Sequence, residues 1–253
     1  MGKSCSNGSD LNLDDFATYF EGLSNGTDLN FVSQDDLPEN NFDIGIDELD
    51  CPFTEEELGK TISTLIRNKS CGIDNIVADF FIDAKSFMVP YLVTIFNRIF
   101  DTGSYPEAWN KGVIVPIVKK GDRNNPRNYR GITLINSLAK LFSLCLRNRL
   151  NAWCEQEHIF TESQFGFRDK RSTVDCVYIL HSLIQKIVSL NKKLFCAFID
   201  YERCFDTILR DALWVKLIQT GVSSKFVTMI KAIYSHVSSC VKLSNNSNIS
   251  DFF

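Results

Sequence analysis

The stretch LFCAFIDYERCFD, residues 194–206, constrains the fold more than any other part of the sequence. Its apolar residues run from Leu194 to Ile199 and end at Asp200. A short apolar run of this kind is typical of a buried β-strand. An aspartate that follows it lies where the strand gives way to a loop, within reach of a divalent cation. Aspartates at strand ends also form caps and turns, so both interpretations of Asp200 stay open on this stretch alone.

The composition favours a folded chain without a membrane anchor. At 253 residues and 44% hydrophobic content, the chain can bury the core of one large domain or two small ones. No run approaches the roughly 18 apolar residues of a membrane helix, and the polar N-terminus has no signal-peptide core. Nine cysteines occur without a CxxC pair, which argues against zinc and disulfide frameworks. We therefore expect an intracellular protein.

Charge divides the sequence into two parts. Residues 1–50 hold twelve Asp or Glu and one Lys and lack sustained periodicity, so we expect an acidic, disordered linker there. The remaining residues hold 26 basic against 19 acidic side chains, and twelve of the basic ones fall between Lys111 and Arg171. This basic stretch suits a polyanion, although a solvated charged face would have the same composition.

The apolar pattern predicts helices joined by short strands and turns. Helical spacing occurs over residues 54–68, 90–103, 137–153, 173–190, 209–220 and 225–236. In the third of these helices, Lys140, Arg147 and Arg149 are expected to face outward. The β-rich runs are residues 113–118, 129–134, 194–200 and 240–243, of which the first two indicate a hairpin with cations at its tip. The last run and the Asn-rich turn after it indicate a second hairpin.

Five blocks, taken in order, carry a resemblance to a known family. They are KSCGID, IVPIVKKGDRNNPRNYRGITLINSLAKLF, RNRL, QFGFRDKRSTVD and AFIDYERCFD. Their order and spacing resemble the reverse transcriptases of non-LTR (LINE-type) retrotransposons over about residues 53–253. The resemblance implies an α+β right-hand polymerase fold, of which residues 51–253 would form the fingers and part of the palm. Such a domain is helix-rich with short antiparallel strands, and its activity implies a location in the cytoplasm and nucleus.

The resemblance assigns the chemistry of two-metal nucleotidyl transfer to the stretch that ends in Asp200. Asp200 matches the family's first catalytic carboxylate, which binds Mg²⁺, and the carbonyl of Ile199 matches a further oxygen ligand. Phe205 matches the aromatic residue that lies under the incoming sugar and excludes a ribose 2′-OH. A core phenylalanine is the alternative for Phe205, because twenty Phe occur in the chain.

The resemblance also assigns a nucleotide clamp to the predicted hairpin. Lys119 and Arg130 match the residues that hold the triphosphate of the incoming dNTP, since lysine offers a point charge and arginine a bidentate fork to phosphate oxygens. Solvated basic side chains are the alternative, and the choice between Lys119 and Lys120 stays open. Gly131 stands where the family usually has proline, which is expected to loosen the backbone beside Arg130.

Two blocks match segments that lie along the nucleic acid in the family. Their members in this chain are Lys69, Gly72, Gln164, Gly166 and Arg168. The implied partners are an RNA template and a DNA primer, which a basic groove would bind through the backbone.

The family's later Gly-Gln turn and the hairpin with two adjacent aspartates have no match in this sequence. Because one aspartate leaves two metal ions under-coordinated, we expect little polymerase activity from this polypeptide alone. Two hypotheses follow. The first is a reverse transcriptase domain that is incomplete in this chain, and the second is a catalytically inactive remnant that at most binds nucleic acid.

Overall fold

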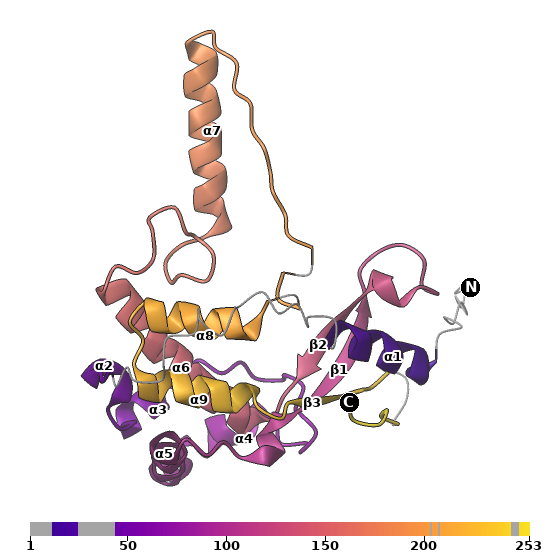
Figure 1. Cartoon of the computed structure of the whole chain (residues 1–253), viewed down its shortest axis with the longest axis vertical. Coiled ribbons are helices and arrows are strands. Elements are labelled where there is room, and N and C mark those ends of the chain that lie inside the picture. The colour runs from indigo at the N-terminus through magenta and orange to yellow at the C-terminus, as the bar shows by residue number, and fades with distance from the viewer. Residues whose placement is uncertain (1–11, 25–43, 203, 207, 244–247) are drawn as a thin grey trace.

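A computed structural model describes residues 12–24, 44–202, 204–206, 208–243 and 248–253 (Figure 1). The helices of these residues are α1 (Leu13–Ser24), α2 (Asp47–Asp50), α3 (Glu55–Ser63), α4 (Ala78–Asp83), α5 (Lys85–Thr102), α6 (Ser137–Gln156), α7 (Thr173–Ser189), α8 (Arg210–Gln219) and α9 (Ser224–Tyr234). The strands are β1 (Lys111–Val118), β2 (Tyr129–Leu134) and β3 (Ser238–Val241). None of these helices is long and apolar enough to cross a bilayer.

The main core forms where α3, α5, α6 and α9 bring large apolar side chains together. Leu58, Phe96, Phe142 and Phe226 are fully buried, one from each helix. The rings of Phe96 and Phe142 meet edge to face with their centroids 5.1 Å apart, a favoured aromatic geometry. The helical spacing in the sequence therefore identified the faces that build this core.

Local signals define several helix ends. The Thr54 side chain accepts a hydrogen bond from the backbone N–H of Glu57 at 3.1 Å, which caps α3. At the end of α5, Gly103 adopts a φ of 65°, which glycine reaches without steric cost. Two predicted bounds were wrong: α3 ends at Ser63, five residues early, and α5 begins at Lys85 with Pro90 inside it.

The sheet has the strand order β2-β1-β3. Strands β1 and β2 form the predicted antiparallel hairpin, with Val113 opposite Leu134 and Val118 opposite Tyr129. Strand β3 is parallel to β1, so the expectation of antiparallel strands alone was wrong, and the sheet is mixed. The chain returns beside β3 as predicted, because the backbones of Ser239 and Phe253 exchange two hydrogen bonds of 2.9 and 3.0 Å.

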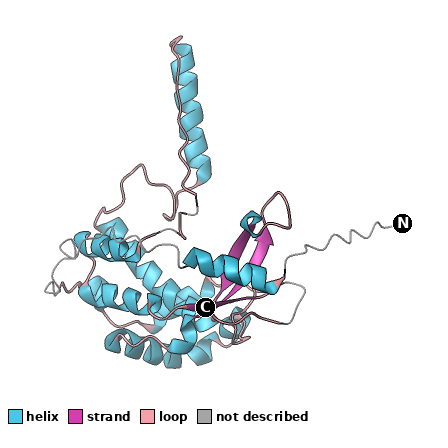
Figure 2. Ribbon diagram, turned by 45° about the vertical axis from the view of Figure 1, so that its right-hand side comes forward, coloured by secondary structure: helices cyan, strands magenta, loops and turns pink. Residues whose placement is uncertain are grey.

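The predicted strand at residues 194–200 is absent from the described structure. This segment has no regular secondary structure, and Phe195 is 89% exposed. A strand persists only when a neighbouring strand satisfies its backbone groups, and residues 194–200 have no such neighbour in the described chain. Helix α7 and the segment that returns from it project away from the helical body in both views (Figures 1 and 2). We call residues 173–202 the arm.

The prediction of a disordered acidic linker over residues 1–50 was wrong for the part that the structure describes. Residues 13–24 form α1, whose Phe16 and Phe20 are 2% and 7% exposed against the sheet. Leu49 of α2 is fully buried in the main core. Residues 1–11 and 25–43 lie outside the described residues. The missed signal was the spacing of Leu13, Phe16, Phe20 and Leu23, which is helical and apolar within an acidic segment.

Arg149 of α6 is buried, which corrects the expectation that it faces outward. Its Nε and Nη2 donate to the two carboxylate oxygens of Glu57 on α3 at 2.7 and 2.8 Å. The remaining N–H groups donate to the carbonyl oxygens of Leu49, Cys51 and Pro52. All five donors of the guanidinium are thus used. The group also lies 3.9 Å from the centroid of the Phe53 ring, in a cation–π arrangement.

Replacing Arg149 with methionine should destabilise the protein by about 3 kcal/mol, because the half-buried carboxylate of Glu57 and three backbone carbonyls would lose their buried partner. Urea unfolding followed by far-UV circular dichroism would measure the change. The matched control is Lys60→Met, because the Lys60–Glu56 pair on α3 has side chains 76% and 77% exposed and should contribute little. Equal unfolding midpoints for both variants would contradict this role of Arg149.

Candidate active site

The hairpin of β1 and β2 presents Lys119 and Arg130 on one face. Arg130 lies opposite Ile117, and the last paired position of the two strands is Val118 opposite Tyr129. The backbone N–H of Lys119 donates to the carbonyl of Asn128 at 2.9 Å, which extends this register by one pair. Because side chains alternate along a strand, Lys119 and Ile117 share the face on which Arg130 lies. Lys120 comes after this last paired position. The geometry therefore favours Lys119 over Lys120 as the neighbour of Arg130.

The loop at the tip of the hairpin is ordered by its own hydrogen bonds. Asn128 Nδ2 donates to the carbonyl of Asp122 at 2.8 Å, and the Tyr129 hydroxyl donates to the carbonyl of Arg123 at 3.0 Å. Lys119 and Arg130 are both exposed, and neither forms an ion pair within the described residues. Two uncompensated cations on a rigid, exposed strand pair suit an anion with several oxygens, such as a triphosphate.

The predicted metal ligands lie in the arm and are exposed. Asp200 has no ion pair or hydrogen bond within the described residues, and Ile199 is 82% exposed. The carboxylate of Asp200 is the kind of oxygen ligand that Mg²⁺ prefers. The described residues contain no group of three or more metal-ligating side chains. The residues present therefore fit one carboxylate contact to the ion and leave the rest of its coordination to other groups.

Phe205 meets the block that contains Gln164 and Gly166. Its ring lies edge to face with that of Phe167, with the centroids 5.8 Å apart. Phe167 has a φ of 63°, an uncommon backbone conformation for an aromatic residue. A Cβ on Gly166 would have no other atom within 4 Å, so a ligand backbone could approach this side of the residue. The structure thus brings together a predicted sugar-contacting residue and a predicted template-contacting block.

Arg168 is held by the protein itself. Its Nε and Nη2 donate to the two carboxylate oxygens of Glu155 on α6 at 2.8 and 2.7 Å, and its Nη1 donates to the carbonyl of Thr161. The hydrogen bond from Arg168 lowers the pKa of Glu155 below its usual range. In this arrangement the guanidinium fastens residues 161–168 to α6. Its predicted contact with nucleic acid stays a prediction that would require this pair to open.

Gly72 has a structural role that the sequence did not indicate. A Cβ at this position would lie 2.6 Å from the backbone nitrogen of Asn136, so only glycine lets this loop pack against the start of α6. Lys69 is exposed on the same loop. The predicted nucleic-acid contacts of both residues stay predictions.

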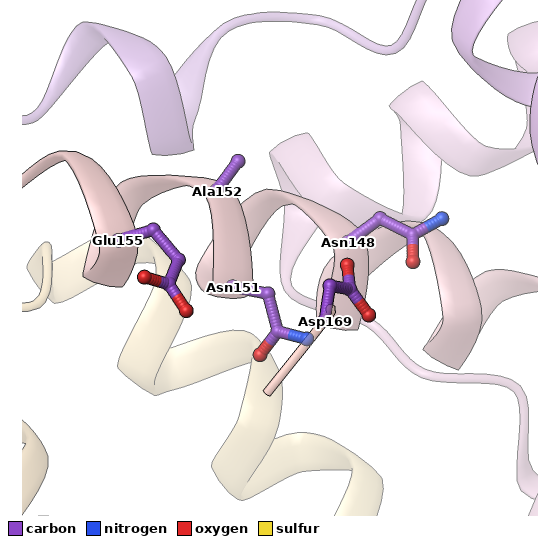
Figure 3. Close-up of a pocket in the computed structure, with 5 residues that line it drawn as sticks. All are labelled: Asn148, Asn151, Ala152, Glu155 and Asp169. Atoms are coloured by element: carbon purple, nitrogen blue, oxygen red, sulfur yellow. The ribbon is translucent and has the colours of Figure 1, made fainter. Parts of the chain in front are cut away.

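A shallow polar hollow of about 160 Å³ lies on α6 (Figure 3). Its lining residues are Asn148, Asn151, Ala152, Glu155 and Asp169. Of the predicted site residues, the hollow contains none, and only Glu155 connects it to them, through Arg168. This hollow is therefore not the predicted nucleotide site.

Comparison with known proteins identifies the class of protein that this hairpin and carboxylate belong to. A family model for reverse transcriptase (RNA-dependent DNA polymerase) matches residues 117–253, which include the predicted site residues from Lys119 to Phe205. The chain belongs to this family. The predicted resemblance to polymerases of non-LTR retrotransposons is confirmed by its relatives.

Three relatives come from mobile elements of Drosophila melanogaster. The probable RNA-directed DNA polymerase from transposon BS is 34% identical over 66% of this chain and 18% of that protein. The probable RNA-directed DNA polymerase from transposon X-element is 29% identical over 68% of this chain and 20% of that protein. The RNA-directed DNA polymerase from mobile element jockey is 27% identical over 64% of this chain and 18% of that protein. The chain thus spans no more than a fifth of these relatives.

Limited proteolysis with chymotrypsin should cut the arm before the helical body. Phe195, Phe198 and Tyr201 are all at least 76% exposed in a segment without regular structure, whereas Phe142 and Phe226 are fully buried. Mass spectrometry of early fragments would locate the cuts. Among sites in the described residues, first cleavage beside Phe142 or Phe226 would contradict the exposed arm.

The Glu155–Arg168 pair should make stability depend on pH at the acidic end. Because folding lowers the pKa of Glu155, the pair contributes stability above the ordinary glutamate range and loses it as pH falls through the lowered value. The difference in unfolding midpoint between wild type and Glu155→Gln should therefore stay constant from pH 7 down to the ordinary glutamate range and shrink as pH falls below it. The control is Glu157→Gln, whose carboxylate forms no ion pair in the described residues. A difference that stayed constant below that range as well would contradict the proposed linkage.

Proposed function

We propose that this chain forms the fingers and the first part of the palm of an RNA-directed DNA polymerase with a right-hand fold. The domain would comprise residues 51–253, with α1 packed against it, and would act in the cytoplasm and nucleus. The observation that carries the proposal is the shared exposed face of Lys119 and Arg130. Two cations fixed there suit the triphosphate of a dNTP, and membership of the reverse transcriptase family supplies the reaction class.

Each part of the proposed site would contribute a separate step. Lys119 and Arg130 would bind the triphosphate oxygens and orient the nucleotide. Members of the family typically use Mg²⁺, which stabilises the attacking and leaving oxygens of an in-line phosphoryl displacement. Asp200, with the Ile199 carbonyl, would hold that ion. Phe205 would exclude a ribose 2′-OH by steric contact, and Phe167 contacts its ring.

The RNA template and DNA primer would lie along the basic side of the domain. Lys69, Gln164 and Gly166 are the proposed contacts, and Arg168 would join them if its pair with Glu155 opened. Gly72 is buried against the start of α6, so it would contribute by shaping the loop that carries Lys69. Contacts of lysine and arginine with phosphates would make this binding weaken as salt rises.

A second candidate function is nucleic-acid binding without catalysis. The exposed position of Asp200 favours it, together with the lack of a metal-ligating group among the described residues. Primer extension on an RNA template separates the two candidates. Incorporation of dNTPs that Asp200→Asn abolishes would support the polymerase, whereas template binding without incorporation would support the second candidate for this polypeptide.

Nucleotide binding tests the hairpin directly. Lys119→Ala and Arg130→Ala should each weaken binding of Mg²⁺-dTTP about tenfold or more, because a hydrogen bond to a charged group contributes roughly 1.5–3 kcal/mol. Isothermal titration calorimetry on the 253-residue chain would measure this change. Lys120→Ala is the matched control, since Lys120 lies beyond the paired register, and it should bind dTTP like wild type. Loss of binding in Lys120→Ala with Lys119→Ala unaffected would overturn the assignment of Lys119.

A further inference from the structure

The backbone beside Arg130 has an unusually close neighbour. A Cβ on Gly131 would lie 2.8 Å from Cε1 of the Phe20 ring and 2.9 Å from Cγ2 of Ile114. Real Cβ atoms do not approach other carbons so closely, so this position requires glycine. The sequence alone suggests that Gly131 loosens the strand. In the structure, the aromatic ring of Phe20 from α1 occupies the space that a side chain at 131 would otherwise fill.

Helix α1 contacts the residues on both sides of Arg130. The rings of Phe16 and Tyr129 meet edge to face with their centroids 4.7 Å apart, and Phe20 packs over Gly131. Phe16 and Phe20 belong to one apolar cluster with Ile114 of β1 and Val241 of β3. The helix therefore packs across all three strands, and Figure 1 shows it beside them.

The position of α1 leaves the face with Arg130 open. The side chain of Tyr129 and the Cβ position of Gly131 lie on the side of the sheet that α1 covers. Because side chains alternate along a strand, the side chain of Arg130 lies on the other side. Ile117 and Ile132, which share the side of Arg130, are 49% and 43% exposed. Near Arg130, one face of the hairpin is thus covered by α1 and the other is exposed to a ligand.

We propose that α1 is a positioning element of the nucleotide clamp, with Phe20 over Gly131 as its main contact. Helix α1 packs against Tyr129 and Gly131 on the face of the sheet opposite Arg130. This packing fixes the backbone of Arg130 and so preorganises its guanidinium for triphosphate oxygens. The inference rests on the proposed role of Arg130. It extends the site to an N-terminal helix that precedes the matched family region, which begins at residue 117.

Binding of Mg²⁺-dTTP to the full 253-residue chain tests the inference. Phe20→Ala should weaken binding about three- to tenfold, less than Arg130→Ala, because the cation stays and only its preorganisation is lost. Phe20→Leu keeps a large apolar side chain and should bind within about twofold of wild type. Thr18→Ala, on the exposed side of the same helix, is the matched control and should not change binding.

Hydrogen exchange adds a readout that is independent of nucleotide. In Phe20→Ala, amides of residues 113–118 and 129–134 should exchange faster, while amides of α5 and α6 keep their wild-type rates. Faster exchange throughout α5 and α6 would show a general structural role and overturn the positioning role. If Phe20→Ala fails to fold, the same comparison uses Gly131→Ala, whose Cβ displaces the ring, and unchanged dTTP binding in that variant would overturn the inference.

The outcomes separate the two proposals. Unchanged dTTP binding in Arg130→Ala would overturn the clamp itself, whatever α1 does. Weakened binding in Arg130→Ala with wild-type binding in Phe20→Ala would overturn only the positioning role of α1. Weakened binding in both, restored in Phe20→Leu, would support the inference.

Discussion

The buried guanidinium of Arg149 joins parts of the chain that are distant in sequence. It binds the carboxylate of Glu57 and three backbone carbonyls of residues 49–52, so α6 is fastened to residues 49–57 by a single side chain. A buried charge is tolerated only when it is paired and hydrogen-bonded throughout, and here every donor has an acceptor. The same segment carries Leu49 and Phe53 into the main core, so the polar contact and the apolar packing specify the same arrangement.

The sheet connects the main core to the hairpin of the candidate site. Strand β1 lies between β2 and β3, and β3 follows α9, which belongs to the main core. The hairpin that carries Lys119 and Arg130 is therefore attached to the core through β1 and covered from behind by α1. Asp200 follows α7, of which no residue is buried, and the ring of Phe205 packs only against that of Phe167 among the described aromatic contacts. The two halves of the candidate site thus differ in how they are packed: one is built into the sheet, and the other is carried by the exposed arm and the segment that follows it.

The parts of the fold that depend on local chemistry could be predicted from the sequence. The β-rich runs at residues 113–118 and 129–134 predicted the hairpin, and Thr54 with Glu57 predicted the start of α3. A strand was wrongly predicted at residues 194–200, because a strand depends on a partner that the local sequence does not specify. Arg149 was misassigned because its type favours the surface, whereas its burial depends on Glu57, 92 positions earlier. Helix α1 was missed because its acidic composition concealed an apolar face.

The parallel pairing of β1 with β3 has a consequence for synthesis on the ribosome. Lys111 of β1 pairs with Ser238 of β3, and 238 − 111 gives a separation of 127 residues. Strand β1 is therefore synthesised long before β3. At about 5–20 residues per second, that interval lasts on the order of 6 to 25 seconds. During it, the edge of β1 that will receive β3 is unpaired and open to association with other nascent chains. Helix α1 is made earlier than the whole sheet, so it is available to cover the apolar face of the hairpin throughout that period.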